Sequence, residues 1–282
     1  MKKNNNKKML VILNRIITIV IAIGVFVMAY PFLSQMYYSA KEKGQAIVFE
    51  KNMGKITDKE LEEKMKFYRE YNNSLENGNS LNNKENRSEK EAVRRYRKMA
   101  SEHEKIGYIS VPKIDQNLPI FAGISDEMLE DGVGQMQGTS LPIGGRGTHS
   151  VLAAHSGLPN VRLFTDLKKV RVGDEFYITN EKETIAYKVD KIKVVLPTNF
   201  NDLTIEKGKD YVTLMTCTPY RVNTHRLLVR GHRIPYSKKA EEEKKKSIRK
   251  LIIEICSFAV IFVLAVIYII RRIKKKKLKI GK

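Results

Sequence analysis

Short runs of β-branched and aromatic residues, interrupted by Gly, Pro and Asp, follow one another from Ile106 to about residue 235. Runs of this kind are typical of strands, and their close spacing is typical of barrels and sandwiches. The runs span residues 108–111, 118–121, 150–153, 175–178, 185–196, 211–217 and 227–234. We therefore expect a mostly β fold, namely a closed, mostly antiparallel β-barrel with short peripheral helices, and two short helical turns near residues 126–131 and 161–167.

Two apolar stretches flank the β-rich part, at residues 9–33 and 251–270. Each is long enough to form a transmembrane helix. Basic residues surround both stretches, and Lys and Arg concentrate on the cytoplasmic side of membrane helices. We expect a two-pass protein of the cell membrane with both termini inside and the β-rich part outside. A cleaved signal peptide is the alternative for the first stretch, but no Ala-x-Ala site follows it.

The net charge of +21 would suit a nucleic-acid-binding protein. Its distribution argues against that class, because five cations lie in residues 1–33 and a net +11 lies in residues 238–282. Only +5 remains for the middle of the chain. We therefore expect a membrane partner and no nucleic-acid partner.

The segment between the first apolar stretch and the β-rich part is polar and helical in pattern. Thr57 with Glu60, and Ser88 with Glu91, each fit a capping box, so we expect two short helices joined by an Asn-rich connector. The expected organisation is a cytoplasmic basic tail (1–8), a membrane anchor (9–33), a helical segment (34–105), the β-barrel (106–237), a basic stalk (238–250), a second membrane helix (251–270) and a cytoplasmic basic tail (271–282).

Cys217 ends the run at 211–217, and Arg226 opens the next run after a loop of eight residues. If these runs pair as neighbouring antiparallel strands, the thiol and the guanidinium lie side by side. A free cysteine can simply be a small apolar residue, but a free thiol outside the cell is open to oxidation unless it is used in chemistry. We interpret Cys217 as a candidate nucleophile, and Cys256, within the second apolar stretch, as inert.

A nucleophilic thiol needs a proton partner, and the candidates are His103, His149, His155, His225 and His232. Spacing alone does not choose among them, and any one of them can be a hydrogen-bonded structural residue. His155 has the most favourable setting, because it follows an apolar run and precedes Ser156 and Gly157, a pattern that predicts a strand end. Arg226 is able to stabilise a carbonyl oxygen that gains charge, or else to form a surface salt bridge. No cluster of ligands has metal-site spacing, so we expect neither metal nor cofactor.

Three longer motifs resemble sortases, specifically the class C or pilin-polymerising type: residues 148–157, 213–220 and 223–231. The similarity covers about residues 105–235. It implies that Cys217 attacks the Thr–Gly bond of a Leu-Pro-x-Thr-Gly-like sorting signal and forms a thioester. It further implies that His155 is the general acid and base and that Arg226 stabilises substrate and oxyanion. The implied partners are surface proteins or pilins that carry the signal, and an accepting amine from a pilin lysine or a cell-wall precursor.

One feature departs from that class. Many class C members carry a lid with an Asp-Pro-aromatic anchor, whereas this chain has no proline between Pro31 and Pro112. We expect residues 72–105 to form either no lid or a loose lid of different chemistry. The missing anchor favours an alternative function, the attachment of surface proteins to a cell-wall precursor. Two further alternatives are a non-catalytic membrane scaffold and a cysteine protease.

Overall fold

The computed structural model describes residues 2–53, 56–78, 87–158 and 161–237, with a few positions between 242 and 260. Three helices come first: α1 (Lys2–Met53), α2 (Asp58–Gly78) and α3 (Arg87–Ser101). A short helix, α4 (Asp126–Asp131), and three 3-10 turns, η1 (Pro112–Ile114), η2 (Leu167–Lys169) and η3 (Asn201–Leu203), lie among the strands. The strands are β1 (Lys105–Val111), β2 (Gln116–Ala122), β3 (Val133–Gln135), β4 (Thr148–Ala153), β5 (Glu175–Thr179), β6 (Thr184–Val195), β7 (Asp210–Thr218) and β8 (His225–Ile234).

The strands close into a barrel in the order β1-β2-β3-β4-β7-β8-β6-β5. The predicted closed, mostly antiparallel barrel is thus confirmed, since all but two of its neighbouring strand pairs are antiparallel. The pair β2 and β3 and the pair β4 and β7 are parallel. In the second pair, the β5–β6 hairpin lies between the two strands in sequence, so the chain returns to β4 running in the same direction.

Each predicted run falls largely within a strand, and residues 126–131 form α4 as expected. The strand β3 was not predicted, because a three-residue strand is too short to show an alternating pattern. The short helical turn expected near residues 161–167 lies slightly later in the chain: residues 163–166 form a turn, and η2 follows from Leu167.

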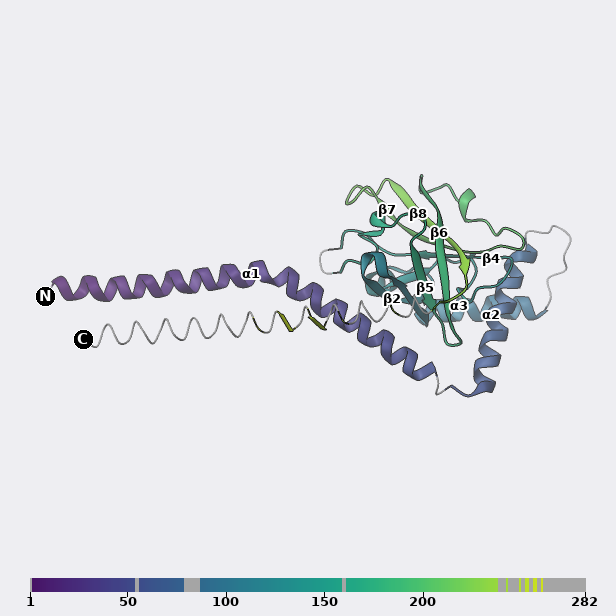
Figure 1. Cartoon of the computed structure of the whole chain (residues 1–282), viewed down its shortest axis with the longest axis horizontal. Helices are drawn as coiled ribbons and strands as arrows, with labels where there is room; N and C mark the ends of the chain where they lie inside the picture. The colour runs from purple at the N-terminus through teal and green to yellow at the C-terminus, as the bar shows by residue number, and fades with distance from the viewer. Residues whose placement is uncertain are drawn as a thin grey trace.

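The helices α2 and α3 pack on the barrel and share its main core (Figure 1). The predicted capping box at the start of α2 is present: the Thr57 amide donates to Glu60, and the Glu60 amide donates to the Thr57 hydroxyl at 3.4 Å. The second box differs from the prediction, since α3 begins at Arg87 and Ser88 lies inside its first turn. Tyr68 and Tyr96 extend from these helices into the core with almost no exposed surface.

The helix α1 contains residues 9–33 and continues without a break to Met53 (Figure 1). Its last part contacts the barrel, where Lys43 donates to Asp115 at 2.9 Å and the ring of Phe49 lies 5.1 Å from that of Tyr108. Within the described residues, no helix is both long enough and apolar enough to cross a bilayer. Most of the second predicted span, residues 251–270, lies outside the described residues.

Candidate active site

The parallel pairing of β4 and β7 brings the predicted histidine and cysteine to the same edge of the sheet. Ala153 pairs with Met215, and the Ala154 amide donates to the Met215 carbonyl at 3.1 Å. His155 and Cys217 each follow two residues after these partners, so both lie where the two strands end. The chain thus brings together residues that are 62 positions apart.

Arg226 joins them from β8. It lies directly opposite Cys217 in the antiparallel pairing of β7 and β8, which confirms the pairing expected from the sequence. Residues that face each other across an antiparallel pair project to the same side of the sheet. The guanidinium donates to the carbonyl groups of Asn223 and His225, at 3.1 Å and 3.2 Å. These bonds restrict the position of the arginine side chain.

Two side chains fasten the ends of β4 and β7 to each other. The Thr216 hydroxyl donates to the Ala154 carbonyl at 2.8 Å, and the Ser156 hydroxyl donates to the Cys217 carbonyl at 3.0 Å. Sequence reasoning did not assign a role to either residue. Their signal in the sequence is their position, since each is the neighbour of a predicted site residue.

His155, Cys217 and Arg226 line one cavity of about 290 Å³. All three are partly exposed, so a ligand in the cavity can reach them. The rest of the lining is mainly apolar and consists of Ile124, Leu129, Met136, Ala153, Ala154, Pro197, Phe200, Met215 and Thr216. Pro197 and Phe200 belong to the loop between β6 and β7. None of the described residues between 34 and 105 lines the cavity.

None of the other four histidines lines this cavity. His149 is buried and hydrogen-bonded through both ring nitrogens, to the Thr204 carbonyl and the Thr213 hydroxyl, each at 2.8 Å. Burial lowers the pKa of His149, while the bond to the Thr204 carbonyl acts in the opposite direction. His103 and His225 make hydrogen bonds with Ser125 and Thr224, and His232 lies 3.7 Å from Asp190.

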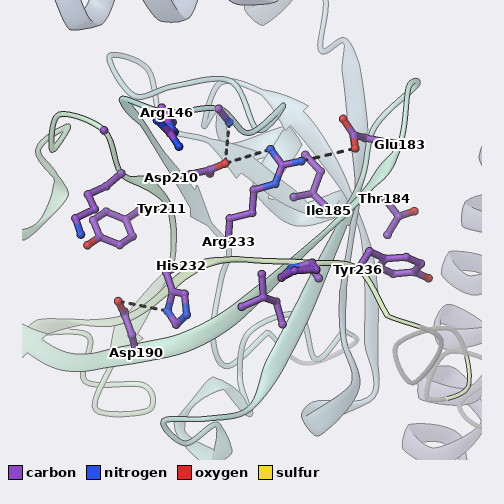
Figure 2. A pocket seen from close by; sticks show the side chains of 16 residues that line it. Arg146, Glu183, Thr184, Ile185, Asp190, Asp210, Tyr211, His232, Arg233 and Tyr236 are labelled. Atoms are coloured by element: carbon purple, nitrogen blue, oxygen red, sulfur yellow. Dashed lines mark hydrogen bonds and ion pairs between the residues drawn. The ribbon is translucent and has the colours of Figure 1, made fainter.

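A larger cavity, of about 850 Å³, lies at the end of β7 opposite Cys217. Figure 2 shows Arg233 between Glu183 and Asp210, and His232 beside Asp190. Its acidic side chains are paired with arginines, Glu183 and Asp210 with Arg233 and Asp190 with Arg230, and its described lining contains neither cysteine nor serine. The smaller cavity is therefore the candidate active site. Among the described residues, no group of three or more His, Cys, Asp or Glu is arranged to hold a metal ion.

Comparisons with known proteins identify the family. The family model of the sortase domain matches residues 109–234. A solved sortase C1 from Streptococcus suis is 54% identical, with 61% of this chain and 97% of that chain covered and a TM-score of 0.58. A solved pilus-related sortase C of Group B Streptococcus is 52% identical, with 67% and 96% covered and a TM-score of 0.57.

A curated relative, sortase A of Streptococcus agalactiae, is 31% identical over 127 residues, which are 44% of this chain. The match spans about half of that relative, or 51% of its length. The solved structures named above, in contrast, are covered almost completely and share the barrel. The chain therefore belongs to the sortase family, whose members are cysteine transpeptidases, and its solved structural neighbours are class C sortases.

Proposed function

We propose that this chain is a pilin-polymerising transpeptidase that cleaves a Leu-Pro-x-Thr-Gly-like sorting signal between Thr and Gly and transfers the Thr carbonyl to a lysine of a pilin subunit. The observation that carries the proposal is the single cavity that Cys217, His155 and Arg226 line together. The names of the solved neighbours, sortase C1 and pilus-related sortase C, support the pilin acceptor.

The proposed first half-reaction forms a thioester. The thiolate of Cys217 attacks the Thr carbonyl carbon, and Arg226 donates to the oxygen as it gains negative charge. The tetrahedral intermediate then collapses, so the bond between the carbonyl carbon and the Gly nitrogen breaks. His155 gives the leaving amine its proton. The products of this step are a thioester on Cys217 and a free N-terminal glycine peptide.

The second half-reaction transfers the acyl group. His155 accepts a proton from the incoming amine as its nitrogen attacks the thioester carbonyl. The carbon–sulfur bond breaks, an amide forms and Cys217 leaves as a thiolate. The largely apolar lining of the cavity supports transfer to an amine over hydrolysis, because it limits the water beside the thioester.

A second candidate is attachment of surface proteins to a cell-wall precursor amine. No described residue between 34 and 105 lines the cavity. A lid formed by that segment would restrict which acceptors enter, so a cavity without it favours this second candidate. The two functions share the thioester and differ only in the acceptor. Both require the barrel to lie outside the cell, and the membrane segments proposed at 9–33 and 251–270 would hold it there with both termini inside.

The test supplies the full chain with a labelled sorting peptide and either a pilin domain or a wall-type peptide amine, and identifies products by mass spectrometry. We expect an acyl adduct on Cys217 and an isopeptide product with the pilin domain. Cys217→Ala should abolish both, whereas Cys256→Ala should not change the rate. A wall-type product alone would favour the second candidate. If Cys217→Ala still binds its partner and the unmodified chain forms no product, the chain is a non-catalytic scaffold. If the unmodified chain cleaves the sorting peptide but only water resolves the thioester, the chain is a protease.

A further inference from the structure

The helix pair α2–α3 contacts a turn that borders the candidate active site. This turn, residues 136–140, lies between β3 and β4 and follows Gln135. Its first residue, Met136, lines the cavity with Cys217 and packs with Met215 against a cluster that includes Val151. The Met136 amide donates to the Val151 carbonyl at 2.8 Å, which holds the turn beside β4. The position of this turn therefore affects the shape of the cavity wall.

Gln135 connects the turn to α3. Its side chain is fully buried, and its amide nitrogen donates to the carbonyl groups of Met136 and Thr139, both at 2.7 Å. Its amide oxygen accepts from the Tyr96 hydroxyl of α3 at 2.6 Å. Two carbonyl acceptors at one end and a hydroxyl donor at the other fix the orientation of the amide. Gln135 uses both ends of its side chain to join the helix to the turn.

The helix α2 contacts the same turn and Leu141, the residue that follows it. Asn72, which is also buried, donates to the Leu141 carbonyl at 3.1 Å and accepts from the Leu141 amide at 2.7 Å. Tyr71 stacks on Tyr96, with ring centroids 4.4 Å apart, and hydrogen-bonds to the backbone of Gly138. The turn is thus bound on both sides by neutral, buried hydrogen bonds from one helix pair.

We propose that Gln135, Tyr96 and Asn72 are positioning residues, through which the helix pair sets the Met136 wall of the cavity and thereby the binding of the sorting signal. The inference rests on the proposed function. In this proposal, α2 and α3 hold the turn that carries Met136 and thereby fix the part of the cavity lining that Met136 forms. Cys217, His155 and Arg226 are fixed by β4, β7 and β8 instead, so the network governs substrate binding more than chemistry.

The chain offers a matched pair of variants. Tyr96→Phe removes the hydroxyl that donates to Gln135 and that also hydrogen-bonds with the Tyr71 side chain, and it keeps the ring that stacks on Tyr71. Tyr68→Phe removes a hydroxyl that is equally buried and that has no hydrogen-bond partner among the described residues. Both variants lose one oxygen from the same core. Only the first breaks the connection to the turn.

We expect Tyr96→Phe to raise KM for the sorting peptide by about three- to tenfold, the effect of one buried hydrogen bond, with kcat little changed. Tyr68→Phe should leave both constants near their original values. In a Met136→Ala background, Tyr96→Phe should raise KM no further. Gln135→Asn, whose shorter side chain does not reach all three partners, should raise KM in the same way. An unchanged KM in Tyr96→Phe, or an equal effect of Tyr68→Phe, would overturn the proposal.

A measurement without activity separates this proposal from the proposed function. With methyl-labelled methionine in the Cys217→Ala chain, the Met136 methyl resonance should shift on Tyr96→Phe and not on Tyr68→Phe. If no variant and no unmodified chain transfers peptide, the proposed function fails, and the methyl spectrum still decides whether Tyr96 positions Met136. A normal product with an unmoved Met136 resonance would leave the function intact and reject the positioning role.

Discussion

At the scale of single residues, the candidate site depends on side-chain hydrogen bonds that join the ends of β4 and β7, in addition to the backbone hydrogen bonds between these strands. Ser156 follows His155 directly, and its hydroxyl donates to the carbonyl of Cys217. The bond therefore links the backbone next to the proposed acid and base with the backbone of the proposed nucleophile. A change of this bond alters the relative position of the two groups without altering either of them.

We predict that Ser156→Ala lowers the rate of peptide transfer by about two- to tenfold, because one hydrogen bond that positions the strand ends is lost. The measurement is kcat for the sorting peptide with a saturating amine. Ser150→Ala is the matched control, since the Ser150 hydroxyl on β4 is buried and has no hydrogen-bond partner among the described residues. Equal rates in the two variants would contradict a positioning role for Ser156.

The three site residues were predictable from the sequence to different degrees. Cys217 and Arg226 follow from an antiparallel pair with a short loop, which is a local pattern. The choice of His155 among five histidines depends on the parallel register of β4 and β7, and short-range patterns do not encode a pairing between segments so far apart. Gln135 gave no signal, because its strand is three residues long.

At the scale of secondary-structure elements, α2 is attached to the barrel by a buried ion pair. Lys64 of α2 donates to Glu181 in the β5–β6 turn at 2.6 Å and also lies 3.0 Å from Glu104. Glu181 is buried, and one of its oxygens has no partner among the described residues. Burial raises the pKa of the Glu181 carboxyl, while the ammonium of Lys64 acts in the opposite direction. The ammonium of Lys64 therefore stabilises the charged form of the buried Glu181 carboxylate.

We predict that Lys64→Met lowers the free energy of unfolding by about 2–4 kcal/mol, because it leaves the buried carboxylate of Glu181 unpaired beside Glu104. The double change Lys64→Met with Glu181→Leu should recover most of that loss. Urea unfolding at neutral pH measures both effects.

Lys98→Met is the control for this pair, since Lys98 lies 3.6 Å from Glu102 and both side chains are mostly exposed. An exposed pair of this kind contributes about 0–1 kcal/mol. If Lys64→Met costs no more than Lys98→Met, the ion pair does not attach α2 to the barrel.

At the scale of the whole molecule, the loop of residues 197–209 connects the active-site cavity to the rest of the barrel. Its Pro197 and Phe200 line the cavity, and its Leu203 is buried. Asp202 of the loop pairs with Lys191 and Lys193 of β6, both at 2.7 Å. The ring of His149 on β4 makes hydrogen bonds with the Thr204 carbonyl of the loop and with the Thr213 hydroxyl of β7. One buried imidazole thus bridges two central strands and the loop that shapes the cavity.

The pKa of His149 makes the stability of this arrangement depend on pH. Burial lowers this pKa in the folded state, and the charge of Arg230 acts in the same direction. In the unfolded chain the imidazole has its ordinary pKa of about 6.5, so it takes up a proton at a higher pH than in the folded protein. The stabilising contribution is therefore complete above about pH 7 and is lost as the pH falls below about 6.5.

We predict that lowering the pH from 7.5 to 5.5 reduces the free energy of unfolding by about 1 kcal/mol more in the unmodified chain than in His149→Gln. The glutamine variant should be less stable at pH 7.5, since it fills the site imperfectly, but it cannot titrate. Urea unfolding of both proteins at both pH values gives the comparison. If His149→Gln loses as much stability as the unmodified chain, other groups carry the dependence, and protonation of His149 is not what weakens the contact between the loop and the barrel.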